Sequence, residues 1–502
     1  MNKLFCGFDL GTSSVKAAVF NRDFEQIFEV KKPLSLINEE ESQAELDPDE
    51  VYEKTITALK ELTAKSAREN RKIDFVSFSS ALHSVIAVDE NFDPLTGCLT
   101  WADSRAQSVV SELEEIYQNR EIYSRTGCPL HAMYMPAKIY WLKKNKPEIF
   151  ESADKFITIK EYIIYKLTGE KVVDYSLAGA GGLFDIRNFC WEQNLMEFLG
   201  LGEDYFSRAV DGKLKLNLRQ EIREDLDSDF KVVPGSGDGP LANLGAGAYK
   251  NNEFVLTIGT SGAVRAFSRE PVIDDLKRTW CYMLDEDVFL PGGAINNGGL
   301  VLQWLRKLLY DSSKEKERFY SDIDSYIEDI EPGSEKLMFL PFLTGERSPN
   351  WDASMRGIML GLGLNHDREQ IIKAGLEGII YRMYAVFKAL EDLLEKQQKV
   401  IATGGFTRSD AWLQLLADIF GREVVNLESF DASTAGAAMM GAVASGFYDS
   451  YFDIDPDWEV KSYKLPDMER HNKYQQLYSL HEEIYRKNQD VFSRLNEIEL
   501  DC

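Results

Sequence analysis

The N-terminal part of the chain alternates between short apolar runs and polar turns. The runs with the length of β-strands are residues 4–10, 15–20, 26–30 and 75–79. After Asp47, apolar residues instead recur at helical spacing, which predicts a helix with Asp47 as N-cap and Pro48 in its first turn. Strands mixed with a helix in this order predict an α/β domain, and the opening meander implies a mixed sheet.

The pattern restarts in the second half of the chain. From about residue 231 the sequence becomes small and Gly-rich, and a new series of strands follows it. A long helix is predicted from about Arg368 to Lys396, with Asp367 and Gln370 as a capping box and apolar residues on more than one face. The predicted parts are an N-terminal domain (1–245), a C-terminal domain (246–445) and a helical tail packed on the core (446–502).

Length and charge limit the class of protein. A chain of 502 residues is too long for one ordinary core, which favours two large domains. The net charge of −26 argues against nucleic acid or an anionic membrane as a partner. The six cysteines are far apart, without a C-x-x-C pair, and no apolar run is long enough to span a bilayer. We therefore expect a protein of the reducing cytoplasm without a zinc site.

A short motif occurs twice, 248 positions apart. Phe8-Asp9-Leu10-Gly11-Thr12-Ser13 is echoed by Leu256-Thr257-Ile258-Gly259-Thr260-Ser261. A strand that reaches a tight Gly turn and leaves as a second strand presents N–H groups and hydroxyls that can hold phosphate. Two copies suggest a duplicated architecture that grips a polyphosphate from both sides. Asp9 stands where a phosphate-bound Mg²⁺ needs an oxygen ligand, whereas the second copy has Thr257 there.

Other segments could carry chemistry or be structural. Gly237-Asp238-Gly239 places a carboxylate without bulky neighbours at the domain junction, suited to take a proton from a hydroxyl, or forms an Asx turn. If extended, Trp101 to Arg105 directs an aromatic ring, a carboxylate and a guanidinium to one side, as a polyol site would, or forms a surface salt bridge. Gly404-Gly405 before a helix fits a phosphate or ribose site, or an ordinary turn. The small residues 432–438 could receive a flat base or a close helix contact.

The ordered motifs resemble those of one family. They are Asp9-x-Gly-Thr, Trp101-x-Asp-x-Arg105, Gly237-Asp-Gly, Gly259-Thr-Ser-Gly, Gly345-Glu-Arg-Ser-Pro349 and Gly404-Gly405. Over roughly residues 4–445 they are similar to the FGGY carbohydrate kinases. The resemblance implies two actin-like, ribonuclease-H-like domains, with mixed sheets flanked by helices and ATP in the cleft between them. It also implies Mg²⁺ and ATP as cofactors, and a small sugar or sugar acid as substrate.

The resemblance further implies roles for single residues. Asp238 would be the catalytic base and, with Asp9, part of the metal site. The implied ATP-binding residues are Gly11, Thr12, Ser13, Gly259, Thr260, Gln303, Gly404, Gly405 and Ser409. The implied substrate-binding residues are His83, Trp101, Asp103, Arg105, Tyr134 and Asp238.

Within the family, the chain is most similar to the members that phosphorylate gluconate. Ser80-Ala81-Leu82-His83-Ser84 stands where xylulokinases usually have G-Q-M-H-G, and it keeps only the histidine. Gluconate would be phosphorylated on its terminal hydroxyl, and the candidate partners of its carboxylate are His83, Arg105, His131 and Lys138, with Tyr134 adding a hydroxyl. The alternatives are a xylulokinase or another sugar or polyol kinase of the family, and an ATP-dependent clamp related to actin or the large heat-shock chaperones. The sequence is compatible with a homodimer.

Overall fold

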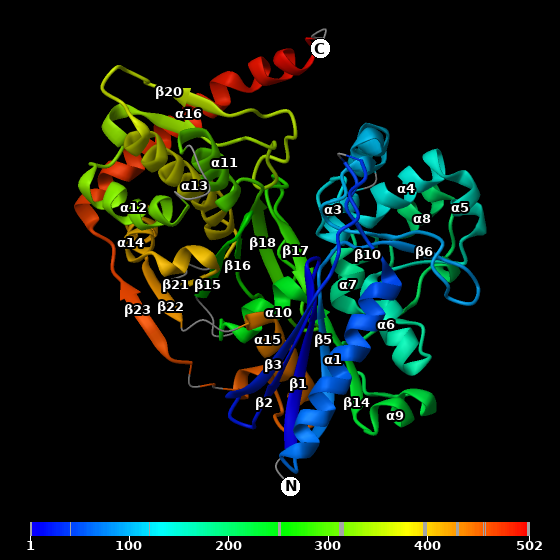
Figure 1. Cartoon of the computed structure of the whole chain (residues 1–502). Coiled ribbons are helices and arrows are strands. Elements are labelled where there is room, and N and C mark those ends of the chain that lie inside the picture. The colour runs from blue at the N-terminus through cyan, green and yellow to red at the C-terminus, as the bar shows by residue number, and fades with distance from the viewer. Residues whose placement is uncertain are drawn as a thin grey trace.

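We describe the protein from a computed structural model of the chain. The described residues are 3–40, 42–119, 121–248, 253–310, 316–394, 399–427, 431–454, 456 and 458–498. They form two lobes, each built around one large sheet (Figure 1).

The N-terminal sheet has the strand order β13-β14-β5-β1-β2-β3. Its strands are β1 (Lys3–Leu10), β2 (Ser14–Phe20), β3 (Gln26–Pro33), β5 (Lys72–Ser80), β13 (Leu216–Asn217) and β14 (Lys231–Gly237). The strands β1, β2 and β3 form an antiparallel meander, whereas β5 and β14 run parallel to β1. The predicted meander and mixed sheet are thus present.

The C-terminal sheet repeats this pattern in the order β17-β18-β16-β15-β21-β22-β23. Its strands are β15 (Glu253–Ile258), β16 (Gly262–Arg265), β17 (Trp280–Met283), β18 (Phe289–Ile295), β21 (Lys399–Thr403), β22 (Glu423–Leu427) and β23 (Val460–Lys464). Here β15 pairs antiparallel with β16 and parallel with β21, just as β1 pairs with β2 and β5. The two Gly-Thr-Ser bends therefore occupy equivalent positions, at the carboxyl ends of β1 and β15.

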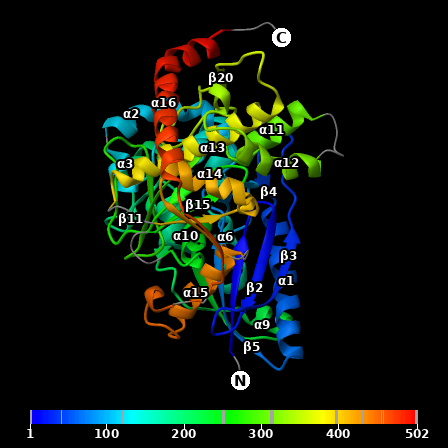
Figure 2. The same ribbon diagram turned by 90° about the vertical axis from the view of Figure 1, so that its left-hand side faces the viewer.

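Helices and short strands surround the two sheets (Figures 1 and 2). The helices are α1 (Pro48–Arg68), α2 (Val110–Asn119), α3 (Ile122–Thr126), α4 (Met135–Asn145), α5 (Pro147–Ser152), α6 (Ile159–Thr168), α7 (Tyr175–Ala180), α8 (Gln193–Leu199), α9 (Gln220–Leu226), α10 (Asp238–Gly245), α11 (Gly299–Leu309), α12 (Lys316–Asp329), α13 (Arg368–Glu391), α14 (Asp410–Phe420), α15 (Ala432–Ala444) and α16 (Met468–Asn496). The 3₁₀ helices are η1 (Arg105–Val109), η2 (Glu203–Tyr205), η4 (Ser334–Lys336), η5 (Gly405–Arg408) and η6 (Tyr451–Asp453). The short strands are β4 (Glu45–Leu46), β6 (Ile86–Val88), β7 (Cys98–Leu99), β8 (Lys155–Ile157), β9 (Val172–Asp174), β10 (Phe184–Asp185), β11 (Cys190–Trp191), β12 (Arg208–Val210), β19 (Met338–Leu340) and β20 (Ile358–Leu360).

Helices α10 and α15 pack together between the two sheets (Figure 1). Small residues allow this close approach: a Cβ built on Gly245 would lie 1.9 Å from the carbonyl oxygen of Ala432, and one on Gly436 would lie 2.0 Å from that of Leu241. A Cβ built on Gly7 of β1 would likewise lie 1.9 Å from the carbonyl oxygen of Thr434 in α15. The small residues 432–438 therefore form a close helix contact, which was one of the two readings of that segment.

Helix caps predicted from the sequence are confirmed. The side chain of Asp47 accepts a hydrogen bond from the N–H of Asp49, and Pro48 opens α1. Asp367 and Gln370 form the predicted capping box of α13. That helix ends at Glu391, earlier than predicted, and residues 395–396 of the predicted helix lie outside the described residues.

The segment after Ser445 contributes more than the predicted outer helix. Strand β23 extends the C-terminal sheet by pairing antiparallel with β22, and α16 then runs along the outside of that lobe (Figure 2). Buried Tyr474 and Tyr485 anchor α16 to the lobe. In the described part of the chain, no helix is long and apolar enough to cross a membrane.

Candidate functional site

The candidate site contains the two Gly-Thr-Ser bends, one from each lobe. In the first bend the N–H of Gly11 donates to the carbonyl of Ser14 (3.2 Å), and in the second the N–H of Gly259 donates to that of Ser261 (2.9 Å). The second bend is also joined to the start of α11, because the carbonyl of Thr260 accepts from the N–H of Gly298 (3.2 Å). Ser13, Gly259 and Thr260 are exposed. Both bends are thus held by backbone hydrogen bonds and leave exposed positions facing solvent.

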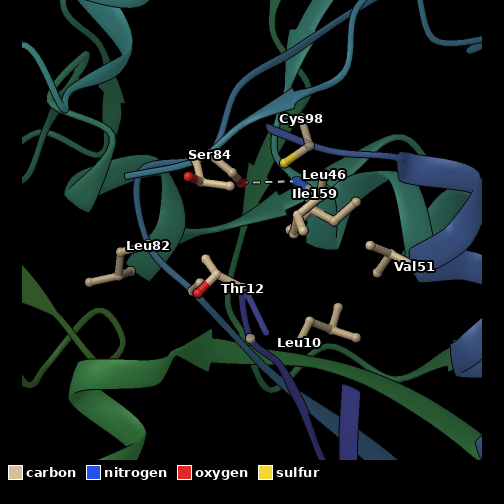
Figure 3. A pocket seen from close by; sticks show the side chains of 11 residues that line it. Leu10, Thr12, Leu46, Val51, Leu82, Ser84, Cys98 and Ile159 are labelled. Carbon is tan, nitrogen blue, oxygen red and sulfur yellow. Dashed lines mark hydrogen bonds between the residues drawn. The ribbon is translucent and has the colours of Figure 1, made fainter. Parts of the chain in front are cut away.

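The first bend packs against an apolar floor that is formed by Leu10, Val51 and Leu82. Figure 3 shows Thr12 beside Leu82, with the side chains of Leu10 and Val51 around a small cavity of about 10 Å³. The hydroxyl of Ser84 on this floor accepts a hydrogen bond from the N–H of Ile159 (3.1 Å). This cavity has room for at most about one water molecule, so side chains fill almost all of the space behind the bend. We infer that its packing fixes the bend.

Asp9 is the acidic member of the first bend. Its Oδ1 accepts a hydrogen bond from the hydroxyl of Ser79 (2.9 Å), and its Oδ2 lies 3.9 Å from Nζ of Lys16. Lys16 is closer to Asp431, at 2.7 Å. Burial, followed by the carboxylates of Asp431 and Asp238, raises the pKa of Asp9 to about 7. The charge of Asp9 is therefore incompletely compensated by the protein.

Asp238 lies where β14 ends and α10 begins. Its Oδ1 accepts the N–H of the next residue, Gly239 (2.7 Å). An Asx turn would use the N–H two residues on, and Pro240 has none, so the segment does not form that turn. Burial raises the pKa of Asp238, while Arg265 and Lys160 act in the opposite direction. The carboxylate thus stands half-buried between a cation from each lobe, because Arg265 is on β16 and Lys160 is on α6.

A buried ion pair supports the Asp238 turn, and the sequence analysis did not find it. Nζ of Lys160 lies 2.8 Å from Oδ2 of Asp174 and donates to the carbonyl of Ser236 (2.8 Å). The hydroxyl of Ser176 accepts the N–H of Gly237 (3.1 Å). Both charged side chains are almost fully buried, at 1% and 2% exposure. No motif spacing marks this pair, since its members come from α6 and β9, distant from Asp238 in sequence.

One cavity of the C-terminal lobe brings together four of the predicted ATP-binding residues. It has a volume of about 770 Å³ and is lined by Gly259, Gln303, Gly405 and Ser409. Its remaining lining residues are Ile258, Gly299, Leu302, Tyr320, Ile323, Asp324, Phe406, Arg408 and Trp412. A pocket with apolar and aromatic walls and a few polar groups is typical of a nucleotide site.

The Gly-Gly turn beside this cavity differs from the prediction in one respect. A 3₁₀ helix, η5, separates Gly405 from α14, so the helix begins after Ser409 rather than directly after the glycines. Gly404 has φ of +104°, and a Cβ there would lie 2.4 Å from the carbonyl oxygen of Ile258. The hydroxyl of Ser409 caps α14 by accepting the N–H of Trp412 (3.0 Å) and donates to Asp324 of α12. Only glycine fits at 404, and Ser409 also has a structural role.

His83 lies in the N-terminal lobe with a strained backbone. Its φ is +65°, a conformation that non-glycine residues rarely adopt. Nδ1 lies 2.9 Å from the carbonyl oxygen of Ala180, and Nε2 lies 3.4 Å from the hydroxyl of Tyr282. Burial, followed by the charge of Lys138, lowers the pKa of His83 to about 3. The ring is therefore neutral, with its proton on Nδ1 and Nε2 as an acceptor.

Tyr134 and Lys138 both contact His83. The Tyr134 ring packs edge-on against the His83 ring at 5.1 Å, and its hydroxyl is 2.9 Å from that of Tyr282. Nζ of Lys138 donates to the carbonyls of His83 (2.5 Å), Thr100 (2.6 Å) and Leu99 (3.4 Å). Since an ammonium has three protons, Lys138 has none left for a substrate.

The segment from Trp101 to Arg105 is not extended, so the condition under which its three side chains would share one side is not met. It forms a turn that leads into η1, and Trp101 is 40% exposed whereas Asp103 is 2% exposed. Nη2 of Arg105 lies 2.6 Å from Oδ2 of Asp103 and also pairs with Glu45. The guanidinium stacks on Trp141 at 4.6 Å. Asp103 and Arg105 thus form an ion pair with each other, and Trp101 is the most exposed of the three side chains.

The chain and its fold are similar to those of known proteins. Models of the FGGY family of carbohydrate kinases match residues 4–245 (N-terminal domain) and 254–445 (C-terminal domain). A gluconokinase from Bacillus licheniformis is 37% identical over 99% of this chain and 98% of its own length. The crystal structure of gluconate kinase from Lactobacillus acidophilus has a TM-score of 0.93 at 31% identity, covering 99% of this chain and 100% of that one. A ligand-bound xylulose kinase from the same organism has a TM-score of 0.92 at 32% identity, covering 98% and 100%.

Two lobes, each built on a mixed sheet of matching topology, define an actin-like sugar kinase, and the predicted fold class is confirmed. The chain belongs to the FGGY family of carbohydrate kinases and is an ATP-dependent enzyme of that class.

Proposed function

We propose that this kinase transfers the γ-phosphoryl group of ATP to the terminal hydroxyl of gluconate, giving 6-phosphogluconate. The observation that carries the proposal is the 37% identity to a gluconokinase over nearly the full length of both chains. The sequence Ser80-Ala81-Leu82-His83-Ser84 supports it, because the glycines and glutamine typical of the xylulokinases are missing there.

Asp238 is the proposed catalytic base. Its carboxylate is half-buried, and the raised pKa makes it a better proton acceptor than a carboxylate in water. Arg265 and Lys160 favour the ionised form that a base requires. Phosphoryl transfer passes through a loose, in-line transition state, so the chain mainly has to orient the two substrates and accept one proton. Asp238 would take the proton from the attacking hydroxyl.

The residues around Asp9 fit a divalent cation. The carboxylates of Asp431 and Asp238 both raise the pKa of Asp9, and Lys16 lies 2.7 Å from Asp431 and 3.9 Å from Asp9. The described ranges contain no group of three His, Cys, Asp or Glu side chains placed to hold a metal. Mg²⁺ at Asp9, with Asp238 nearby, would therefore share its remaining ligands with phosphate oxygens and water. When bound, Mg²⁺ would neutralise the charge of the β- and γ-phosphates.

The proposed nucleotide site combines the two bends with the 770 Å³ cavity. Gly11, Thr12 and Ser13 would contact the phosphates from one lobe, and Gly259 and Thr260 would contact them from the other. Gln303, Gly404, Gly405 and Ser409 would lie beside the nucleoside. Gly259 and the start of α11 connect the bend to the cavity, because the N–H of Gly299 donates to the carbonyl of Gly259 (2.8 Å).

The cavity assignment predicts the effect of filling it. A Cβ at Gly405 would have nothing within 4 Å, so Gly405→Leu should fold and then place its side chain in the cavity. We expect KM for ATP to rise about tenfold or more, equivalent to about 1.4 kcal/mol, while KM for the sugar changes little. Thr57→Leu serves as the control, because that exposed position on α1 lies outside the cavity lining. An unchanged KM for ATP in a folded Gly405→Leu enzyme would refute the assignment.

A substrate panel tests the proposed function. Purified enzyme with Mg-ATP is assayed for ADP release with gluconate, xylulose, ribulose, fuculose and glycerol. We expect the highest kcat/KM with gluconate. A preference for xylulose would establish the alternative xylulokinase function, which the 32% identity to a xylulose kinase supports.

A further inference from the structure

Strand β5 lies between the two strands that carry the proposed metal residue and the proposed base. Asp9 is near the end of β1, and Asp238 follows directly after β14. Both strands run parallel to β5, and Ser80, the last residue of β5, is paired with Leu10 of β1 and with Gly237 of β14. The chain that leaves β5 therefore passes between the first Gly-Thr-Ser bend and the turn that carries Asp238.

The side chain of Leu82 fills the space between these two parts of the site. It is 8% exposed and lines the cavity of about 10 Å³ behind the first bend, together with Gly11 and Thr12 (Figure 3). On its other side, a Cβ built on Gly237 would lie 2.2 Å from Cδ2 of Leu82 and 3.2 Å from its Cγ. One side chain thus lies against both the bend and the residue directly before Asp238.

Leu82 also explains why residue 237 is a glycine. Gly237 has φ of −72° and ψ of 161°, a conformation that an alanine adopts without strain. After the two Leu82 atoms, the next atom near a Cβ at this position is Oγ of Ser176 at 3.4 Å, an ordinary van der Waals distance. The space that a side chain at 237 would need is therefore taken by Leu82, and the backbone does not require a glycine there.

The backbone on each side of Leu82 is held in place. The N–H of Ala81 donates to the carbonyl of Leu10 (2.9 Å), and the carbonyl of His83 accepts from Nζ of Lys138 (2.5 Å). The side chain of Leu82 therefore extends from a fixed point and limits how closely the bend and the turn before α10 approach each other. Phosphoryl transfer depends on such separations, because a misplacement of about 1 Å can cost about 10²-fold in rate.

We propose that Leu82 is a positioning residue, which sets the separation between the first bend and the catalytic base Asp238. The bend has its own backbone hydrogen bond, from Gly11 to Ser14 (3.2 Å), and keeps its shape without Leu82. Removal of the Leu82 side chain leaves the space beside Gly237 empty, and Asp238 is then no longer confined to one position relative to the bend. This inference rests on the proposed role of Asp238 as the base.

The first test measures kcat and both KM values for Leu82→Ala and Leu82→Met, with the sugar that gives the highest kcat/KM in the substrate panel. For Leu82→Ala we expect kcat to fall about tenfold or more, because the base loses its position, while KM for ATP changes less than about threefold. Leu82→Met should keep kcat within about threefold of the wild type, because methionine nearly conserves the volume of leucine. A general structural defect would not be confined to kcat and relieved by methionine.

A double-mutant cycle tests the contact itself. Gly237→Ala alone should lower kcat about tenfold, because its Cβ and the Leu82 side chain cannot occupy the same space. In the double variant Gly237→Ala/Leu82→Ala, the new methyl group enters the space that Leu82 has left. The combined loss should therefore be smaller than the product of the two single losses, by about fivefold or more.

Leu59→Ala is the matched control for lost packing. Leu59 is a fully buried leucine of α1 in the same lobe, and it lines neither of the two cavities described above. It should lower Tm as Leu82→Ala does, but keep the wild-type kcat at a temperature at which both variants are folded. A folded Leu82→Ala enzyme with wild-type kcat would overturn the inference. So would single losses that multiply in the double variant, or an equal fall of kcat in Leu59→Ala.

Failure of the base assignment gives a different result from failure of this inference. If Asp238→Asn keeps more than about a tenth of the wild-type kcat, the proposed base is refuted, and the role of Leu82 with it. If Asp238→Asn loses its turnover while the losses at 82 and 237 multiply, only the role of Leu82 is refuted. A wild-type enzyme that phosphorylates no sugar of the panel would refute the proposed function before any variant is compared.

Discussion

Asp238→Asn is expected to bind ATP normally and to lose turnover by a factor of about 10²–10⁴. The amide has nearly the same shape as the carboxylate and can still accept the N–H of Gly239, so the turn at the start of α10 should persist. It cannot accept the proton of the attacking hydroxyl. The loss should therefore appear in kcat, measured as ADP release under saturating gluconate and Mg-ATP, with little change in either KM.

The control for this prediction is Asp275→Asn, which removes the same charge from an exposed position in the other lobe. It should retain wild-type kinetics. If Asp238→Asn kept more than about a tenth of the wild-type kcat, Asp238 would not be the base.

Lys160→Met is expected to destabilise the protein by about 3–5 kcal/mol, because it leaves Asp174 as an uncompensated buried charge. The same change removes the hydrogen bond to the carbonyl of Ser236, two residues before Asp238. We therefore expect lower activity at temperatures where the variant is still folded. Urea unfolding followed by circular dichroism, with the midpoint and slope compared to wild type, measures the first effect.

A matched control is Lys60→Met, which breaks the ion pair with Asp225. Both side chains of that pair are nearly half exposed, so its loss should cost about 0–1 kcal/mol. Equal unfolding midpoints for the two variants would show that the Lys160–Asp174 pair contributes no more than a surface pair. A second variant that also replaces Asp174 by Asn should recover stability, because it removes the buried charge while its side-chain oxygen can still accept the N–H of Leu177 at the start of α7.

Local chemistry explains which parts of the fold were predictable. The meander before Asp47, the cap of α1 and the capping box of α13 depend on residues within a few positions of one another, and all are present. The motif repeat around Gly11 and Gly259 predicted a duplication, and the matched pairing of the two sheets confirms it. Strand β23 was missed because its partner β22 lies more than thirty positions earlier in the chain.

Parts of the candidate site were less predictable than its motifs. The spacing of Trp101, Asp103 and Arg105 was compatible with a shared face, but a turn and η1 give the three side chains different surroundings. Glu45, which pairs with Arg105, is 60 positions away, so the sequence could not show that this guanidinium was already occupied.

The sequence by itself determined the two bends, the carboxylate at the domain junction and, through the ordered motifs, the family. Those features are local, because a glycine turn or a capped helix depends on neighbouring residues. Only the tertiary structure decided which charges are free. Lys138 donates to backbone carbonyls, Lys160 pairs with Asp174, and Arg105 pairs with Asp103 and Glu45. The physical reason is that the availability of a charge depends on what packs around it, and those partners come from distant parts of the chain.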